Sequence, residues 1–212
     1  MAQRTIHYLF GERISSQIEI ADKERFLLGS ILPDAIHACD RDRSHFKVKT
    51  DTLTYFDFEA FRDQFLDFML QDDLYLGYYM HLVEDAFYRV FLYEDRMARP
   101  GTPEEVQRLH QDYHILNSYI VNKYNIHNIL TRDISLAATP MGRIAAFHTR
   151  EFLEALSHDF IEKTQGATAY LTEALLDEFV ETYLPVAIQE IKSLREGVSA
   201  LRAKAYAWPT KK

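Results

Sequence analysis

Apolar residues recur every three or four positions along most of this chain, and this spacing restricts the fold more than any other feature. The clearest case lies within residues 56–69, where apolar residues at 58, 61, 65, 68 and 69 fall on one helix face. Only 7 Gly and 6 Pro occur among the 212 residues, although a β-protein uses both in its many turns. We therefore predict an all-α fold, a multi-helix bundle in a single domain over residues 1–212.

Periodicity and capping signals together predict where the helices begin and end. Thr102-Pro103-Glu104-Glu105 is typical of a helix start, because Thr caps, Pro suits the first position and Glu105 completes a capping box. Thr139-Pro140 gives a similar start, whereas residues 35–54 form a long polar loop with a short strand near 50–55. The predicted helices cover residues 5–17, 23–32, 56–69, 74–97, 102–124 and 139–163, and one kinked helix or two helices cover 171–201.

Composition excludes several classes of protein. Lys and Arg number 24 against 32 Asp and Glu, a formal net charge of −8, so we do not expect binding to a long nucleic acid. No run approaches the roughly 20 apolar residues of a membrane span, and no secretory signal is visible. The single cysteine, Cys39, excludes a disulfide framework and a thiolate metal cluster. We therefore expect a cytoplasmic protein without a transmembrane segment.

Nine histidines are the unusual part of the composition, and His81 gives the strongest local signal. His81 and Asp85 are one turn apart on a helix that is otherwise apolar and aromatic, so they project from the same face. An imidazole and a carboxylate at this spacing can bind one divalent ion, such as Zn²⁺, Mn²⁺ or Fe²⁺. The alternative is a hydrogen bond between the two side chains or an exposed pair.

Other candidate ligands lie nearer the N-terminus. Pro33 ends a helix, so Asp34 is presented at the helix end, and His45 follows in the long loop. The alternative for this segment is that Asp34 caps a turn while the loop histidines lie in solvent. His7 lies on the apolar stripe of the first helix, where a lone histidine is commonly a satisfied core residue.

A later segment repeats the helical spacing of ligands. His110 and His114 are one turn apart, as in many zinc enzymes, whereas Asp112 lies on another face of the same helix. A polar helix face that carries two histidines is the alternative. His148 and Glu151 are also spaced to chelate an ion.

Taken in order, His7, Asp34, His45, His81 and Asp85 on a helical scaffold resemble the zinc-dependent phospholipase C superfamily, which includes the fungal single-strand-specific nucleases. The family shares a His near the N-terminus, a Gly-x-x-x-Pro-Asp segment, a loop His and a His-x-x-x-Asp helix with aromatic neighbours. The second of these elements is found here at 29–34. The resemblance covers roughly residues 1–90. It implies a phospholipase C-like bundle with metal ions in a cleft and hydrolysis of a phosphoric ester by a metal-bound hydroxide.

Several later elements of the family pattern are absent or altered. The family uses the mature N-terminal amine as a ligand and places a His soon after the His-x-x-x-Asp helix, and this sequence shows neither feature. A later His-x-x-x-Glu pair has only approximate counterparts in His110 with His114, or His148 with Glu151. We therefore expect one or two ions, zinc before manganese or iron, with His110, Asp112 or His114 completing the ligand shell.

The resemblance also assigns roles in catalysis. Asp34 is the candidate catalytic carboxylate, which bridges metals or takes the proton of the attacking water. Arg41, Arg43 and Lys47 in the same loop are candidates to bind the substrate phosphate, although each could instead be a solvated loop charge. The acidic chain favours a small or lipid-like phosphoester over a polymer. The long closing helices are a candidate homodimer face.

Two other functions remain open from the sequence. An HD-type phosphohydrolase requires adjacent His-Asp ligands, and His158-Asp159 is the dipeptide that could supply them. The other is a helical binding or scaffold protein with a degenerate metal site, because 13 tyrosines suit partner binding. Bound metal on the predicted ligands would exclude the scaffold.

Overall fold

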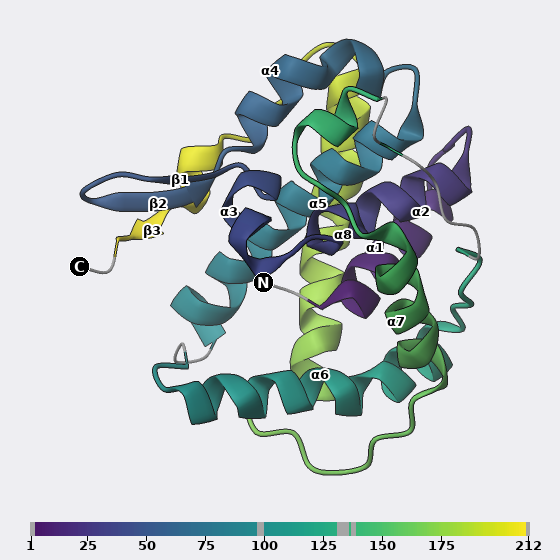
Figure 1. The fold of residues 1–212 in the computed structure, drawn as a ribbon, viewed down its shortest axis with the longest axis vertical. Coiled ribbons are helices and arrows are strands. Elements are labelled where there is room, and N and C mark those ends of the chain that lie inside the picture. Colours follow the sequence, from purple (N-terminus) through teal and green to yellow (C-terminus); the bar gives the residue numbers. More distant parts are fainter. Residues whose placement is uncertain (1–2, 97–99, 131–135, 137–138, 211–212) are drawn as a thin grey trace.

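The computed structural model describes residues 3–96, 100–130, 136 and 139–210. The described residues fold into a body of α-helices with one small sheet, as the periodicity predicted (Figure 1). The helices are α1 (Arg4–Ser15), α2 (Lys23–Ile31), α3 (Arg41–Ser44), α4 (Phe58–Met69), α5 (Asp73–Val90), α6 (Pro103–Tyr124), α7 (Thr149–Ile161) and α8 (Glu173–Arg195). The strands are β1 (Lys47–Lys49), β2 (Leu53–Phe56) and β3 (Trp208–Pro209).

Two glycines let α2 and α5 cross in backbone contact at the centre of the molecule. A Cβ atom on Gly29 would lie 2.1 Å from the carbonyl oxygen of Leu74, and one on Gly77 would lie 2.1 Å from that of Phe26. Any side chain at either position would force the helices apart, because core packing leaves no room for it. This contact brings the end of α2, where Asp34 follows in a 3₁₀ turn (Leu32–Asp34), beside the middle of α5.

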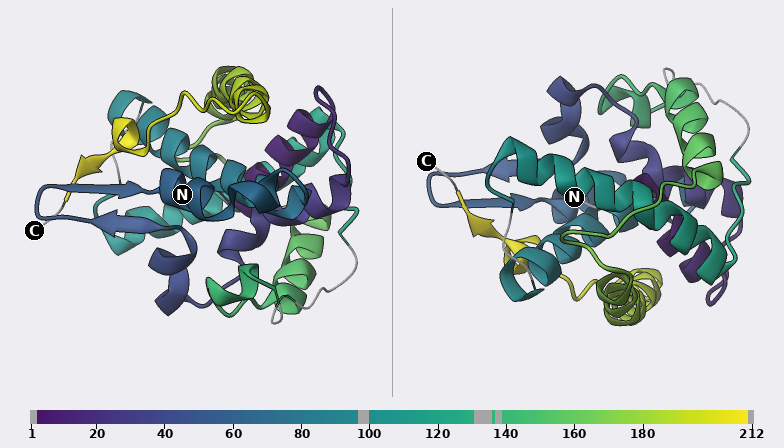
Figure 2. Two further views of the ribbon diagram at one scale, coloured as in Figure 1. Left: turned by 90° about the horizontal axis from the view of Figure 1, so that it is seen from above. Right: turned by 90° about the horizontal axis from the view of Figure 1, so that it is seen from below.

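The small sheet projects from one end of the helical body (Figure 2). β1 and β2 form an antiparallel hairpin, and β3 from the C-terminal end of the chain pairs antiparallel with β2, with Thr54 opposite Trp208. The strand expected near residues 50–55 is therefore present, whereas β1 and β3 were not predicted. The expected long loop also contains α3 and a 3₁₀ turn (Ala38–Asp40).

Of the two helix starts predicted from capping signals, one is confirmed and one is wrong. The capping box at Thr102 and Glu105 is present at the start of α6. The start predicted at Thr139-Pro140 is wrong, because only a 3₁₀ turn (Met141–Arg143) forms there and α7 begins at Thr149. The backbone N–H of His148 instead donates to the carbonyl of Ala35, which holds this segment against the N-terminal half.

The remaining helix predictions hold except at their ends. The predicted helix 74–97 is α5 followed by a π-helical segment (Phe91–Arg96), and its expected end at Met97 lies outside the described residues. α8 continues through Pro185 as one helix and ends at Arg195, short of the predicted end near Leu201.

One continuous apolar core joins residues of α1, α2 and α4–α8. α5 runs through its centre, and nearly all of its side chains are buried. Among the described residues, no helix combines the length and apolar character that crossing a membrane requires.

Candidate metal centre and adjoining pocket

Five predicted ligands meet in the core, although they come from four separate segments. His7 comes from α1, Asp34 from the turn after α2, His45 from the residue after α3, and His81 and Asp85 from α5. The four side chains other than Asp34 are fully or almost fully buried, and Asp34 keeps 11% of its side-chain surface exposed. The i, i+4 spacing on α5 and the end position of Asp34 therefore point to one place, as the sequence suggested.

The Nε2 nitrogens of His45 and His81 face each other, the Nε2 nitrogens of all three histidines face the carboxylates, and the rings of His7 and His81 are stacked with centres 3.9 Å apart. His45 Nε2 lies 3.2 Å from His81 Nε2, 3.4 Å from Asp34 Oδ1 and 3.5 Å from Asp85 Oδ2. His7 Nε2 lies 3.7 Å from Asp34 Oδ2 and 3.7 Å from Asp85 Oδ1. Two ligands on one tetrahedral zinc ion are separated by roughly 3.3 Å, given bonds of about 2.0–2.1 Å. The observed separations fit donors that share an ion.

Backbone carbonyls fix the protons of two of these histidines. His81 Nδ1 lies 2.8 Å from the carbonyl oxygen of Ser30, and His45 Nδ1 lies 2.9 Å from that of Arg41. A carbonyl only accepts a hydrogen bond, so these contacts favour the tautomers with the proton on Nδ1 and a lone pair on Nε2. Ser44 Oγ, which donates to the carbonyl of Pro33, also lies 2.9 Å from His45 Nδ1 and can accept the same proton. A hydrogen bond from Nδ1 to a carbonyl oxygen is typical of histidines that bind a metal ion through Nε2.

Two Nε2 lone pairs at 3.2 Å repel each other unless a proton or a metal ion lies between them. Burial makes this arrangement costly, because water cannot screen it. The donor set of imidazole and carboxylate groups is the one that Zn²⁺, Mn²⁺ and Fe²⁺ accept. The residues present therefore fit a divalent ion.

Each carboxylate reaches both sides of the cluster. Asp34 directs Oδ2 toward His7 and Oδ1 toward His45. Asp85 directs Oδ1 toward His7 and Oδ2 toward His45, with His81 also 3.8 Å from Oδ2. Carboxylates placed in this way can bridge two ions, so the geometry accommodates either one or two.

The charges of the cluster favour metal binding by His81 and Asp34. Burial lowers the pKa of His81 well below its usual value, with a further contribution from the neighbouring His7, so its imidazole is neutral. Burial alone would raise the pKa of Asp34, but the hydrogen bond with His45 and the positive charge of Arg41 act in the opposite direction, and the pKa lies below its usual range. A carboxyl group with a lowered pKa is ionised at neutral pH, as a metal ligand must be.

Glu84 is a further buried carboxylate that contacts the cluster from outside. Its Oε1 lies 3.0 Å from His7 Nδ1. Burial lowers the pKa of His7, but Glu84, together with Asp85 and Asp34, reverses this effect and raises the pKa to about 9. Carboxylate–histidine pairs of this kind orient the imidazole and increase its basicity as a ligand. The sequence analysis did not single out Glu84, although it directly precedes Asp85.

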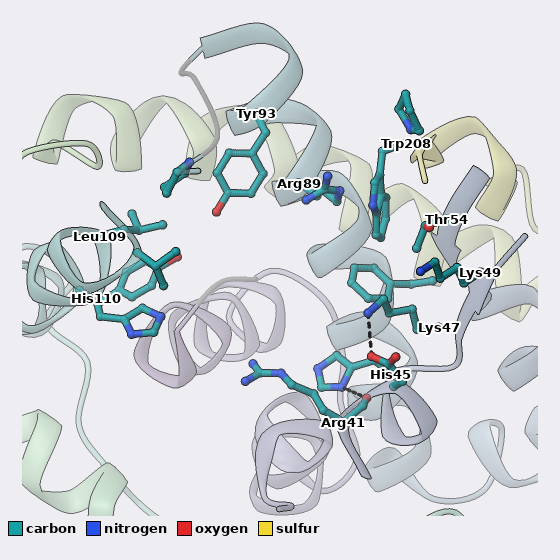
Figure 3. Close-up of a pocket in the computed structure, with 16 residues that line it drawn as sticks. Arg41, His45, Lys47, Lys49, Thr54, Arg89, Tyr93, Leu109, His110 and Trp208 are labelled. Atoms are coloured by element: carbon teal, nitrogen blue, oxygen red, sulfur yellow. Dashed lines mark hydrogen bonds and ion pairs between the residues drawn. The ribbon is translucent and has the colours of Figure 1, made fainter. Parts of the chain in front are cut away.

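A cavity of about 420 Å³ opens beside the cluster, and His45 belongs to both (Figure 3). Its walls come from α3 and the hairpin, the C-terminal part of α5, the N-terminal half of α6, and β3. Basic side chains on these walls are Arg41, Lys47, Lys49 and Arg89, with His110 opposite Arg41 across the space. Asp42 is the carboxylate among the described lining residues.

Arg89 is nearly buried in this pocket and was not predicted. Its guanidinium carbon lies 3.9 Å from the ring centre of Trp208 and 5.4 Å from that of Tyr93. Stacking on an aromatic ring fixes the plane of a guanidinium group. The sequence held a signal for Arg89, because it follows Asp85 by four residues on the same helix face. It held none for Trp208, whose place depends on strand pairing with β2.

Three predicted additions to the ligand shell lie elsewhere. His110 lines the pocket but belongs to none of the described groups of close metal-ligand residues. Asp112 is buried, and its carboxylate accepts hydrogen bonds from the backbone N–H groups of residues 169–171. His114 is exposed and pairs with Glu162 at 2.9 Å. Their spacing along α6 therefore did not predict their surroundings, which depend on how the helix packs.

Of the three predicted phosphate-binding residues, two line the pocket and one does not. Arg41 and Lys47 line the pocket, where Arg41 lies 2.9 Å from Asp34 Oδ1 and Lys47 lies 2.7 Å from Asp42 Oδ1. Arg43 does not line the pocket, because its guanidinium donates instead to the carbonyl of Arg143 at 2.7 Å.

Comparison of the chain with models of protein families, with curated proteins and with solved structures returned no match. The resemblance to zinc-dependent phospholipases C therefore depends on the residues of the centre alone.

Proposed function

We propose that this chain is a metal-dependent hydrolase of a phosphoric ester. One observation carries the proposal: three histidine Nε2 atoms and two carboxylates converge in the core, beside a basic pocket. The ligands are His7, Asp34, His45, His81 and Asp85, and zinc is the first candidate ion, before manganese or iron.

A bound divalent ion would supply Lewis acidity and lower the pKa of a coordinated water molecule from 15.7 to about 7. The protein's own residues would orient the ligands and bind the substrate. Ser30, Arg41 and Glu84 hold the outer nitrogens of the three histidines and so fix the directions of their Nε2 atoms. The pocket cations attract and orient the anionic ester.

We assign Asp34 the role of an anionic ligand that connects the centre with the pocket. Its partly exposed carboxylate contacts His7 and His45 on one side and Arg41, at the pocket edge, on the other.

The HD-type alternative gains no support from the described residues. His158 is exposed at the surface of α7. Asp159 is buried but forms an ion pair with Arg4 of α1. Asp159 lies close to His114 and Glu162, but His158 does not belong to that group, so the adjacent His-Asp ligand pair of an HD site is not formed.

The decisive test is the metal content of the protein, purified without a histidine tag and measured by elemental analysis. We expect one or two equivalents of zinc, manganese or iron in the wild type and a loss in His81→Ala and in Asp85→Ala. His158→Ala, an exposed histidine, is the matched control and should keep the metal. Phosphomonoesters and phosphodiesters would then be screened with that ion.

Absence of metal, with none taken up on dialysis against each ion, would overturn the proposal. The cluster would then be structural, and a helical binding protein would be the better interpretation.

A further inference from the structure

Of the two described histidines that line the pocket, one lies outside the metal centre. His110 is on α6 and faces the cavity opposite Arg41 (Figure 3). It belongs to none of the described groups of close metal-ligand residues. Its ring lies beside that of Tyr113, with ring centres 6.1 Å apart, and no described residue forms a hydrogen bond with its nitrogens. These nitrogens can therefore contact a molecule in the cavity.

The ionisable groups of the pocket walls differ in whether they can release a proton near neutral pH. Arginine, lysine and tyrosine side chains hold their protons there, and an aspartate has already lost its own. The described lining residues of these types are Arg41, Lys47, Lys49, Arg89, Tyr93, Tyr113 and Asp42. Of the two histidines, His45 is a proposed metal ligand. His110 is therefore the described lining residue best suited to exchange a proton with a substrate.

Arg41 connects the metal centre with His110. Its guanidinium lies 2.9 Å from Asp34 Oδ1, and it extends from the side of His45 toward His110 (Figure 3). Burial lowers the pKa of His110, and the positive charges of Arg41 and His114 contribute to the same effect. A phosphate group bound by Arg41 would thus have the proposed ligands on one side and His110 on the other.

We propose that His110 is the general acid of the hydrolysis and gives its proton to the oxygen of the leaving alcohol. As the water oxygen forms a bond to phosphorus, the bond to the ester oxygen breaks. The ester oxygen keeps the electron pair and takes the proton from the imidazolium ring. The attacking water releases one proton to the solvent, and the solvent protonates the imidazole again. The inference rests on the proposed function, because it presupposes an ester bound at the metal centre.

The substrate itself would protonate this acid. In the free protein, burial and the charges of Arg41 and His114 lower the pKa of His110, which favours the neutral imidazole at pH 7. A phosphate dianion next to the ring acts in the opposite direction and raises the pKa. The charged and titratable neighbours of the ring are Arg41 from α3 and, on α6 itself, Tyr113 and His114.

Nuclear magnetic resonance of the zinc-loaded protein tests this step without catalysis. The imidazole C–H signal of His110, identified by its absence from His110→Gln, is followed against pH with and without inorganic phosphate. We expect phosphate to move the midpoint upward by about one pH unit or more. The exposed His158 is the control, and its midpoint should not move. An unmoved midpoint of His110 at every phosphate concentration would overturn the inference.

Esters with different leaving groups test the catalytic role. Glycerol 3-phosphate releases an alcohol that needs a proton to leave, whereas p-nitrophenyl phosphate releases a stable phenolate that does not. We expect His110→Gln to lower kcat about 10²-fold or more for glycerol 3-phosphate and less than about three-fold for p-nitrophenyl phosphate. His114→Gln alters the exposed histidine one turn further along α6 and should keep both rates near those of the wild type.

The failures of the two proposals are distinguishable. An equal loss of rate with both esters, an unchanged rate with glycerol 3-phosphate, or a loss of zinc from His110→Gln would overturn the role of His110 and leave the proposed function standing. Wild-type protein that takes up no metal in the elemental analysis would overturn the proposed function itself. The phosphate titration decides the role of His110 even where the wild type hydrolyses neither ester.

Discussion

Within the described part of the chain, two regions gather potential metal-ligand side chains, and the region in the core has more of the features of a metal centre. In the core, the inner nitrogens of His7, His45 and His81 converge with two carboxylates. Nearer the surface, the exposed His114, the half-buried Glu162 and the buried Asp159 bring ligand atoms within 4.8 Å of one another. Proximity alone does not distinguish these groups.

The difference lies in what the ligand atoms already bind. Asp159 pairs with Arg4, and Glu162 accepts hydrogen bonds from Asn117 and Thr164 as well as contacting His114. These partners satisfy the surface carboxylates without an ion. In the core, hydrogen bonds to carbonyls occupy the outer nitrogens of His45 and His81 and leave the inner lone pairs facing each other. The partners of the ligand atoms, rather than the count of ligands, favour the core group as the candidate metal centre.

The largest expected effect is the loss of zinc-dependent stability in a core variant. Zinc at 100 times its dissociation constant should raise the free energy of unfolding of the wild type by about 2.7 kcal/mol. His45→Ala should abolish most of this increment, and His114→Ala should retain it. Urea denaturation with and without zinc measures both. An equal loss in the two variants would show that the surface group shares in metal binding.

The core centre should also depend on the α2–α5 contact, on which the surface group does not depend. Gly77→Ala places a Cβ atom 2.1 Å from the carbonyl oxygen of Phe26 and should destabilise the fold by about 1–3 kcal/mol. Because Asp34 follows α2 while His81 and Asp85 lie on α5, zinc affinity should fall as well.

Gly101→Ala is the matched control for this substitution. The nearest atom to its added Cβ, Glu105 Oε2, lies at 3.7 Å, an ordinary contact. Urea denaturation and zinc titration of both variants provide the measurement. Wild-type stability and zinc affinity in Gly77→Ala would contradict the tight crossing of the two helices.

The same comparison explains how far the sequence could predict the site. His81 with Asp85, and His110 with His114, share one local spacing, and each pair does lie on one helix face. The first pair faces the core, and His114 faces Glu162 at the surface. Which helix face is buried against which neighbour depends on tertiary packing, and local spacing does not contain that information.

The errors in the predicted fold also arise because tertiary contacts are not encoded in local sequence patterns. Pro140 is compatible with a helix start, but the segment before Thr149 stays largely non-helical, and its His148 bonds to Ala35 far away in the sequence. Trp208 belongs to a strand of two residues that forms only by pairing with β2. Long helices such as α6 were predictable because their caps and periodicity are local.

A smaller effect on zinc affinity is expected from Glu84, which contacts His7 but is not itself one of the proposed ligands. Glu84→Gln keeps the shape and removes the charge next to His7 Nδ1, so zinc affinity should fall by about ten-fold. Glu162→Gln alters the corresponding neighbour of His114 and should leave zinc affinity unchanged. Competition of each variant with a chelating dye measures the change. Unaltered affinity in Glu84→Gln would show that Glu84 does not orient His7.

The last effect is spread over several pH units and concerns the stability of the metal-free protein. The pKa of His7 is raised from 6.5 to about 9 in the folded state, so between these values the folded chain holds a proton that the unfolded chain has lost. Its contribution to stability is complete below pH 6.5 and is lost as the pH rises through about 9, with a slope on the order of 1 kcal/mol per pH unit.

Zinc should reverse this trend, because an ion on His7 displaces the same proton and binds more tightly as the pH rises. The stabilisation caused by zinc should therefore grow between pH 6.5 and 9, while the metal-free protein weakens over that window. Urea denaturation at pH 6, 7.5 and 9 tests both slopes, and His7→Gln should flatten them. Unchanged slopes in His7→Gln would place the titrating group elsewhere and remove His7 from the centre.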